Sequence, residues 1–428
     1  MRTIIQEIPI WIKVLRWIKL ISLTSIAQIG IQAIGLISGI LIIRLLPTQE
    51  YALYTLANTI LGTMTILADG GISAGVMIYG GKVWSDRKKL GVVAVTGFEL
   101  RRKFGVASLL IAIPILLYLL LHHGASLPMS ILIIISLIPA FFAALSDSLL
   151  EIAPKLHQDV TSLQKNLIAA NIGRFVLVTA AILIFPWAFI IIIGGGIPRI
   201  WANIQLKKTS TTYVDWNQKS DPIVRKDIIT VVKKLLPNSI YYCVSSQTTI
   251  WLISIFGSTM AVAQIGALGR ISIIFSIFST LFQTLVVPRF ARLSSHKNHL
   301  IKWFITLQVI LFLFVATTLL IQNYFFDIIL WLLGSKYYNL ENNLAWAISS
   351  AVLSSVAGMI YGLLVSRNWI LPPAISISIN ILSQIAIIPF VDFSTLKGAY
   401  TFTIIHTLIG ILIGYISVYF FLRNRNYA

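Results

Sequence analysis

The chain has 428 residues, of which 57% are hydrophobic and only 11% are charged, and its mean hydropathy is +0.88. A formal net charge of +19 would fit a nucleic-acid-binding protein, but so apolar a composition excludes a soluble basic domain and with it a nucleic-acid partner. The one cysteine, Cys243, excludes an intramolecular disulfide and a cysteine-rich metal site. The composition therefore indicates an integral membrane protein.

Apolar runs long enough to cross a bilayer recur along the whole chain. A spanning helix needs about 20 mostly apolar residues, and by that measure the sequence predicts about twelve of them. The expected spans are 20–43, 52–80, 104–121, 129–149, 163–184, 187–205, 228–256, 262–287, 302–321, 343–365, 370–391 and 398–422. We therefore expect an all-α polytopic membrane protein.

Basic residues are concentrated in alternate connections between these spans. With the N-terminus placed in the cytoplasm, 28 of the 33 Lys and Arg residues fall in inside segments. The outside segments hold only Arg44, Lys336 and Lys397, while Arg174 and Arg270 fall within spans. This asymmetry follows the positive-inside rule and predicts that both termini are cytoplasmic.

The longest polar stretch divides the chain near its midpoint. It runs from Lys207 to Asp227 and is typical of a solvated cytoplasmic linker. The predicted organisation is an N-terminal six-helix lobe (1–206), the linker (207–227) and a C-terminal six-helix lobe (228–428). Even helix counts make the two halves parallel repeats, and we expect them to surround a central cavity.

Enzyme and cofactor signatures are scarce. The one Gly-Lys pair, Gly81-Lys82, lacks the glycine that a Walker A motif requires, so no ATPase is predicted. The adjacent His122 and His123 cannot face one metal ion as an i, i+4 pair would, and they are interpreted as interfacial polar residues. We therefore expect neither an enzyme, nor a cofactor, nor a metal site.

Four ionisable residues lie within the expected spans, where an unpaired charge costs at least about 2.5 kcal/mol. They are Asp69, Asp147, Arg174 and Arg270. The two arginines come from different halves, so they can converge on the central cavity, and a guanidinium fork suits phosphate oxygens. Arg270 and Arg174 are therefore the candidate substrate-binding residues. The alternative is a structural pair of Arg174 with Asp147 or Asp69.

The two acidic residues at membrane depth, Asp69 and Asp147, are the candidates for ion coupling. Asp69 is followed by Gly70-Gly71, where another backbone can approach closely. The alternative role for Asp69 is that of a counter-ion to an arginine.

Several short motifs resemble those of a transporter family. They are LLPTQEYALY at 45–54, LADGGI at 67–72, IGALGRI at 265–271 and VPRFAR at 287–292. They resemble Wzx-type polysaccharide or O-antigen flippases of the multidrug/oligosaccharidyl-lipid/polysaccharide exporter superfamily. The resemblance implies two six-helix lobes around a cationic cleft in the bacterial inner membrane. It also implies ion-driven movement of undecaprenyl-diphosphate-linked glycans to the periplasm, with the polysaccharide polymerase and chain-length machinery as partners.

Three other function classes fit the sequence less well. A major-facilitator transporter usually has Gly-x-x-x-Asp-Arg after its second helix, whereas the stretch 81–89 has one residue too many between Gly and Asp. A drug exporter of the same superfamily would favour an acidic cavity for apolar cations. Membrane glycan polymerases resemble one another in having long external loops with polar and basic residues. Here the longest external stretch, 322–342, is short and nearly uncharged.

The charge asymmetry predicts the topology directly. Reporter fusions after Lys88 and Lys219 should report the cytoplasm, and fusions after His123, Gly257 and Asp392 the periplasm. A periplasmic signal at Lys219 would contradict the twelve-span topology.

Overall fold

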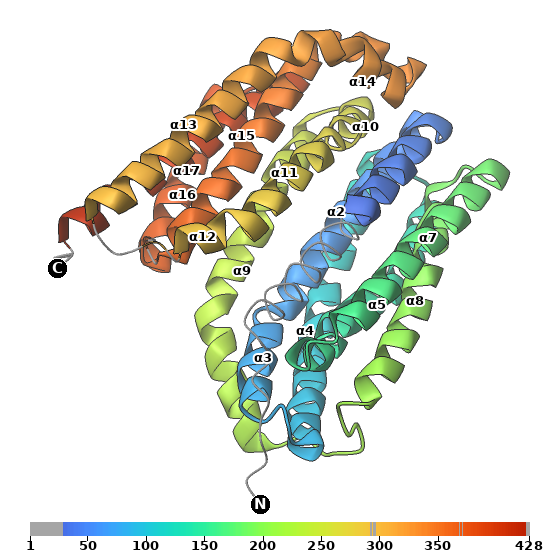
Figure 1. The fold of residues 1–428 in the computed structure, drawn as a ribbon. Helices are drawn as coiled ribbons and strands as arrows, with labels where there is room; N and C mark the ends of the chain where they lie inside the picture. Colours follow the sequence, from blue (N-terminus) through green and yellow to red (C-terminus); the bar gives the residue numbers. More distant parts are fainter. Residues whose placement is uncertain (1–28, 292, 294–296, 368, 370, 425–428) are drawn as a thin grey trace, which may run out of the picture.

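A computed structural model describes residues 29–424 except 292, 294–296, 368 and 370, and regular structure in this part of the chain is helical throughout (Figure 1). Nine described helices are long and apolar enough to cross a membrane. Three shorter apolar helices, Ile29–Leu45, Gln247–Phe256 and Ala374–Phe390, give a counterpart to each remaining expected span. The all-α, multi-pass fold is therefore confirmed. Residues 20–28 of the first expected span lie outside the described residues.

After the helix Ile29–Leu45, the first half of the chain forms seven described helices. They are α2 (Thr48–Asp69), α3 (Ile72–Lys82), α4 (Arg87–His122), α5 (Leu127–Leu150), α6 (Ile152–Leu156), α7 (Val160–Ile184) and α8 (Ala188–Thr211). Short polar side chains begin three of them by accepting backbone N–H bonds, as N-cap residues do. These caps are Asp86 for α4, Ser126 for α5 and Asp159 for α7.

The second half forms a similar series. It consists of α9 (Pro222–Phe256), α10 (Thr259–Leu268), α11 (Ile271–Leu285), α12 (Val287–Ala291), α13 (Lys297–Ile321), η1 (Gln322–Phe325), α14 (Phe326–Leu333), η2 (Ser335–Leu340), α15 (Glu341–Ser366), α16 (Pro373–Ile387), η3 (Ile388–Phe390) and α17 (Leu396–Asn424). The predicted linker is shorter than expected, because α8 continues to Thr211 and Asp221 caps α9 by accepting from the Ile223 N–H at 2.6 Å. The lobe boundaries themselves stay a prediction.

The expected continuous span 52–80 is wrong in one respect, because it is broken at two glycines. Gly70 and Gly71 adopt φ values of 48° and 96°, in the left-handed region that favours glycine. The Gly70 N–H still bonds the Ile66 carbonyl, which closes the last turn of α2. A Cβ on Gly71 would lie 2.8 Å from Leu235 of α9, so the break also admits a neighbouring helix.

The expected span 262–287 has a slighter interruption, because the backbone of Gly269 and Arg270 keeps right-handed helical geometry. Helix α10 ends at Leu268, the chain turns at Gly269 and Arg270, and α11 begins at Ile271. Asp69 and Arg270, two of the ionisable residues singled out from the sequence, therefore both lie where a membrane helix is interrupted.

The apolar cores of the two lobes share one large cluster at one end of the molecule, and at the other end only α9 of the second half joins a first-lobe cluster. The largest buried cluster combines residues of α2, α4, α5 and α8 with residues of α10, α14 and α15. Two smaller clusters lie toward the opposite end: one joins α3, α4 and α9, and the other joins α12, α13, α15 and α17. We call the end with the shared core the outer end and the opposite end the inner end.

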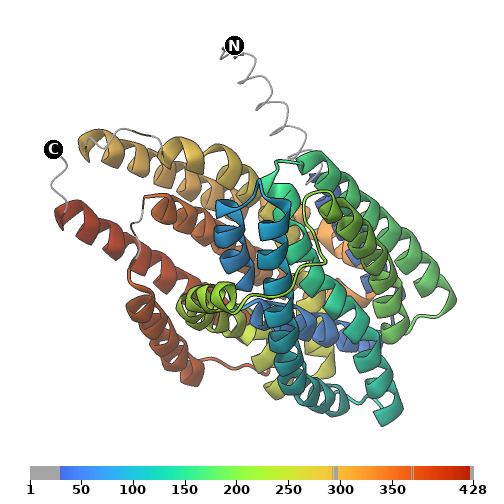
Figure 2. The same cartoon turned by 90° about the horizontal axis from the view of Figure 1, so that it is seen from below.

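Helix α9 is the main described connection between the lobes at the inner end. It packs on α2, α3 and α4 of the first lobe and on α16 and α17 of the second. Figure 2, viewed from the inner end, shows α9 between α3–α4 and the α16–α17 pair. The Arg225 guanidinium of α9 also pairs with Glu99 of α4 at 2.5 Å.

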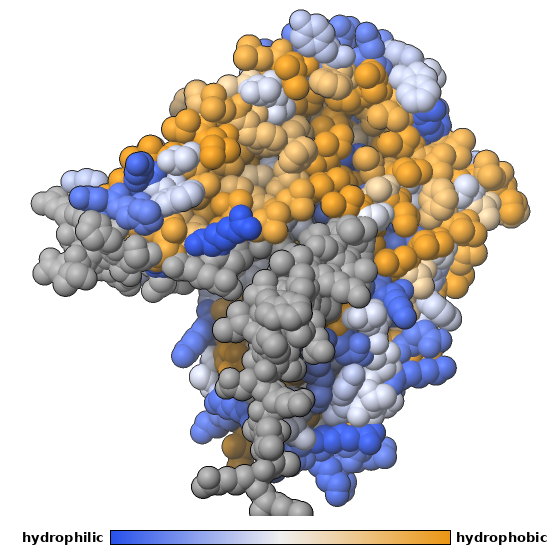
Figure 3. All heavy atoms as spheres, in the orientation of Figure 1, coloured by the Kyte–Doolittle hydropathy of each residue, from blue (hydrophilic) through white to orange (hydrophobic). Residues whose placement is uncertain are grey.

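Hydrophobic side chains cover a broad band of the surface, as a bilayer requires (Figure 3). Hydrophilic residues gather at the inner end, below this band, where the α3–α4 turn and the start of α9 lie. The charge pattern predicts that this end faces the cytoplasm.

Candidate functional site

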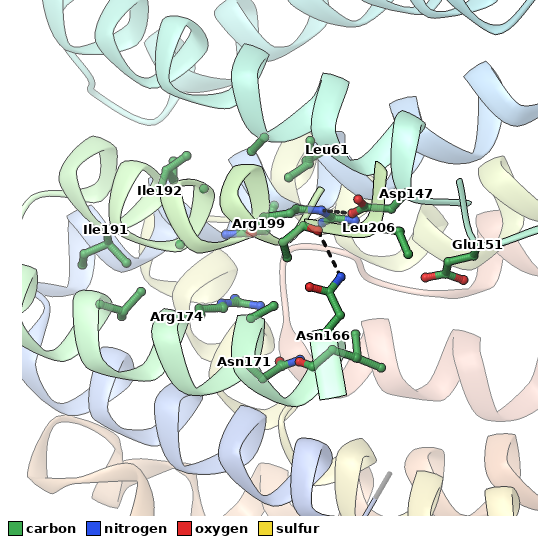
Figure 4. A pocket seen from close by; sticks show the side chains of 18 of the residues that line it. Leu61, Asp147, Glu151, Asn166, Asn171, Arg174, Ile191, Ile192, Arg199 and Leu206 are labelled. Atoms are coloured by element: carbon green, nitrogen blue, oxygen red, sulfur yellow. Dashed lines mark hydrogen bonds and ion pairs between the residues drawn. The ribbon is translucent and has the colours of Figure 1, made fainter. Parts of the chain in front are cut away.

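A cavity of about 300 Å³ lies within the first lobe, between α2, α5, α7 and α8 (Figure 4). Its walls combine aliphatic side chains with an unusual number of polar ones at membrane depth. The polar lining residues are Tyr54, Asn58, Asp147, Glu151, Asn166, Asn171, Arg174 and Arg199. The cavity is therefore suited to a ligand that carries both charged and hydrogen-bonding groups.

Glycine allows α7 and α8 to approach each other closely beside this cavity. A Cβ on Gly194 would lie 3.3 Å from the Leu177 carbonyl oxygen of α7. A Cβ on Gly195 would lie 3.7 Å from Arg174 Nε, so the Arg174 side chain runs along a bare stretch of α8 backbone. This agrees with the general use of small residues at membrane helix contacts.

Both carboxylates of the cavity have basic partners. Asp147 pairs with Arg199, whose Nε lies 3.3 Å from Oδ2, and accepts from Asn203 Nδ2 at 2.7 Å. Glu151 pairs with Lys155 at 2.6 Å. Arg174 has no carboxylate partner among the described residues, so the expected alternative, a structural pair with Asp147 or Asp69, is not formed there. Arg174 is therefore the charged side chain of the cavity lining that has no ion-pair partner in the described chain.

The two arginines singled out from the sequence converge on one tyrosine. The Tyr54 hydroxyl of α2 interacts electrostatically with Arg174 of the first lobe and Arg270 of the second. Arg270 also lies beside the Tyr51 hydroxyl, which has no hydrogen-bond partner of ordinary geometry in the described chain. Arg174 lines the cavity, whereas Arg270 lies behind Tyr54 and does not.

Backbone geometry brings Arg270 to this position. The residue occupies the turn between α10 and α11, and its side chain lies against Gly39 of the first helix, where a Cβ would be 3.2 Å from Arg270 Cδ. The first helix therefore contacts the α10–α11 turn near the start of α2. The proximity of Arg270 to Tyr51 and Tyr54 could not be read from the sequence, because more than 200 residues separate them.

Asp69 belongs to a different cluster. Its carboxylate forms an ion pair with Arg101 of α4, whose side chain is only 3% exposed. It also accepts from the Ser73 N–H at 3.2 Å and the Gly71 N–H at 3.4 Å, across the α2–α3 break. These contacts match the alternative role of Asp69 as a counter-ion to an arginine. The arginine is Arg101, which the charge pattern predicts to lie in an inside segment.

His123 is a site residue that sequence reasoning missed. It follows α4, is 3% exposed, and joins the lobes at the outer end. Its Nε2 lies 2.9 Å from the Ser254 carbonyl oxygen, and its Nδ1 lies 3.1 Å from Thr259 Oγ1. We call His123, Ser254 and Thr259 the outer latch. An adjacent histidine pair in a loop gives no sequence signal for such a contact.

Two basic residues join the lobes at the same end. Arg44 donates to the carbonyl oxygens of Trp331 and Leu332 at the end of α14. Lys336 of η2 donates to the Leu46 carbonyl oxygen at 2.6 Å. These are two of the three basic residues predicted to lie outside, and both satisfy backbone carbonyls at helix ends.

Among the residues with described placement, no group of three or more His, Cys, Asp or Glu side chains could hold a metal ion.

Comparison with known proteins gives structural relatives only. No family model matches the chain, and no curated protein matches it by sequence. The fold superposes on an inward-facing MATE transporter of the MOP superfamily with a TM-score of 0.70 and 14% identity, over 94% of this chain and 99% of the other. The fold is that of MATE transporters.

Other MATE structures are less similar. An outward-facing MATE transporter of the MOP superfamily gives a TM-score of 0.57 at 13% identity, over 95% of each chain. A eukaryotic MATE transporter gives 0.57 at 14% identity, over 96% of this chain and 97% of the other. The MATE fold accounts for the two lobes of membrane helices.

Replacing Asp69 by Asn should destabilise the protein, because Arg101 would stay buried without a counter-charge. We expect a loss of about 3 kcal/mol, at the low end for a broken buried ion pair because Asp69 is 32% exposed. The measurement is the thermal unfolding midpoint in detergent, with the double variant Asp69→Asn/Arg101→Met expected to recover most of the loss. An unchanged midpoint combined with loss of gradient-driven movement in vesicles would instead assign Asp69 to ion coupling.

The outer latch should open as the pH falls. Burial lowers the pKa of His123, and the neighbouring His122 lowers it further, so the latched histidine is neutral. Release into water returns its pKa to about 6.5, so acidification through this value favours the released, protonated form. Distances between spin labels at positions 127 and 338, in a Cys243→Ala background, should lengthen between pH 7.5 and 5.5.

His123→Gln should abolish this pH dependence, since glutamine can bond Ser254 but does not titrate in this range. The matched control is His122→Gln, which should keep it. Equal pH responses in wild type and His123→Gln would contradict the latch.

Proposed function

We propose that this protein is a secondary transporter that works by alternating access and is seen here closed at its outer end. The outer latch, the contacts of Arg44 and Lys336, and the shared apolar core support closure at that end. The higher TM-score with an inward-facing than with an outward-facing structure supports an inward-facing state. In such a cycle, one lobe rocks against the other around a fixed site.

The observation that carries the substrate proposal is the placement of Arg174 and Arg270 on either side of Tyr54. Two guanidinium groups at membrane depth, neither with a carboxylate partner in the described chain, form a site with a net positive charge. A planar guanidinium offers paired N–H donors that match phosphate oxygens, so an anionic, phosphate-bearing group is the substrate class that fits best.

Within this class, we propose an undecaprenyl-diphosphate-linked glycan as the substrate. The sequence resemblance to flippases supports this choice, and so do the amide side chains of the first-lobe cavity. Asn58, Asn166 and Asn171 each donate to a main-chain carbonyl oxygen, which leaves their amide oxygens available to sugar hydroxyls. The same proposal includes the bacterial inner membrane as location, cytoplasmic termini and the polysaccharide polymerase as partner.

The second candidate is a drug exporter of the same superfamily. The names of the structural relatives support it more directly, because two of them are described as multidrug resistance MATE transporters. Asp147 and Glu151 in the cavity would attract an organic cation. Their ion pairs with Arg199 and Lys155 weaken that attraction, and Arg174 opposes it.

Removing the Arg270 side chain should prevent transport of an anionic substrate. In cells that depend on this chain, Arg270→Ala should abolish surface polymer at normal protein abundance and lead to accumulation of lipid-linked repeat units. Arg270→Lys should keep part of the export, because it keeps the charge but loses the fork. Arg174→Ala is expected to resemble Arg270→Ala.

The matched control is Lys165→Gln, which removes one exposed charge from α7, the helix that carries Arg174. It should export normally. Normal export by both arginine variants would overturn the anionic substrate, and loss of resistance to cationic drugs on deletion, without any lipid-linked intermediate, would favour the drug exporter.

A further inference from the structure

A second cavity, of about 490 Å³, lies on the first lobe between α4, α5, α8 and the stretch that connects α8 to α9. Its lining includes Phe98, Arg101, Arg102, Phe142, Lys207 and Trp216. Helices α5 and α8 separate it from the cavity described above, since different faces of these two helices line the two spaces. We call this second cavity the inner pocket, and it plays no part in the proposed transport cycle.

The inner pocket lies at the depth where the membrane meets the cytoplasm. Arg102 comes two residues before the expected span 104–121, and Lys207 comes two residues after the expected span 187–205. Ser146 and Leu150, at the end of the span 129–149, complete the wall. The pocket therefore opens at the level of lipid headgroups of the inner leaflet.

The charges of the inner pocket are unbalanced. Arg101 is neutralised by Asp69, and Glu99 is neutralised by Arg225. Arg102 and Lys207 are exposed and have no acidic partner among the described residues. Two positive charges thus remain at the mouth, which is complementary to a phosphate group.

Two buried N–H donors of the lining also have no acceptor. They are Arg101 Nε and Trp216 Nε1, and the Trp216 ring is held edge-on against Phe98 at 5.2 Å. Buried donors in proteins are normally satisfied, so these two call for an acceptor. A phosphate or glycerol oxygen would supply one.

Apolar surface continues from the inner pocket into the membrane. Phe142 lines the pocket and is 38% exposed, and Ile135 on the same helix is 57% exposed. An acyl chain can lie along this surface while its headgroup reaches the two cations.

We infer that the inner pocket binds an anionic phospholipid of the inner leaflet, with Arg102 and Lys207 holding its phosphate and Trp216 donating to the headgroup. Basic pockets between membrane helices on the cytoplasmic side bind acidic headgroups in this way. The site is separate from the transported substrate and does not depend on the proposed function.

The test is a native mass spectrometry titration of the purified full-length protein with phosphatidylglycerol, using phosphatidylethanolamine as the zwitterionic reference. Wild type should bind one phosphatidylglycerol in clear preference. Because each basic residue near the headgroup contributes about fivefold, Arg102→Gln/Lys207→Gln should bind it about 25-fold more weakly. Trp216→Phe, which keeps the ring but not the donor, should weaken binding to a smaller extent.

The matched control is Lys103→Gln/Lys208→Gln, which removes the same charge from the adjacent exposed positions that do not line the pocket. It should bind phosphatidylglycerol like wild type. Equal weakening in both double variants, or none in either, would overturn the site. Full competition by millimolar inorganic phosphate would assign the pocket to a soluble anion and overturn the lipid.

Discussion

Charge at membrane depth is the constraint on which the interior of this protein depends. An ionised side chain there needs a partner, and the first lobe supplies carboxylates with one in each case: Asp69 with Arg101, and Asp147 with Arg199. Arg174 is the exception, because it faces a cavity, forms an ion pair with no carboxylate of the described chain, and interacts with the Tyr54 hydroxyl. A membrane protein keeps such a cation only where a ligand or water can reach it, which is why the site is located here.

The two broken helices give this arrangement its geometry. After the left-handed glycines that follow Asp69, its carboxylate accepts from the Ser73 N–H of α3 and also pairs with the Arg101 guanidinium. In the second half, the turn at Gly269 places the Arg270 side chain against the first helix and Tyr54. Both breaks lie beside contacts between elements that are distant in sequence, where a rocking movement would be accommodated.

Fold and site give different information about function. The MATE fold is shared with multidrug transporters, but a fold alone does not define a substrate. The side chains of this chain define the electrostatic preference, and their balance is positive at Arg174 and Arg270 and again at the inner pocket.

The sequence by itself determined the number of spans, their order and the ionisable residues within them, because hydropathy over about 20 residues and charge asymmetry are local properties. It did not determine which side chains contact one another. The alternative pairing of Arg174 with Asp147 or Asp69 is not formed in the described chain. His123 has the sequence pattern of an ordinary interfacial residue, although it joins α4 to α9 and α10. Which side chains meet depends on how helices far apart in the chain pack, and only the tertiary structure decides that. The helix break at Gly70-Gly71 depends on both sequence and tertiary structure. The two glycines are visible in the sequence, but the conformation that interrupts the helix depends on the packing of Leu235 and Arg101 around them.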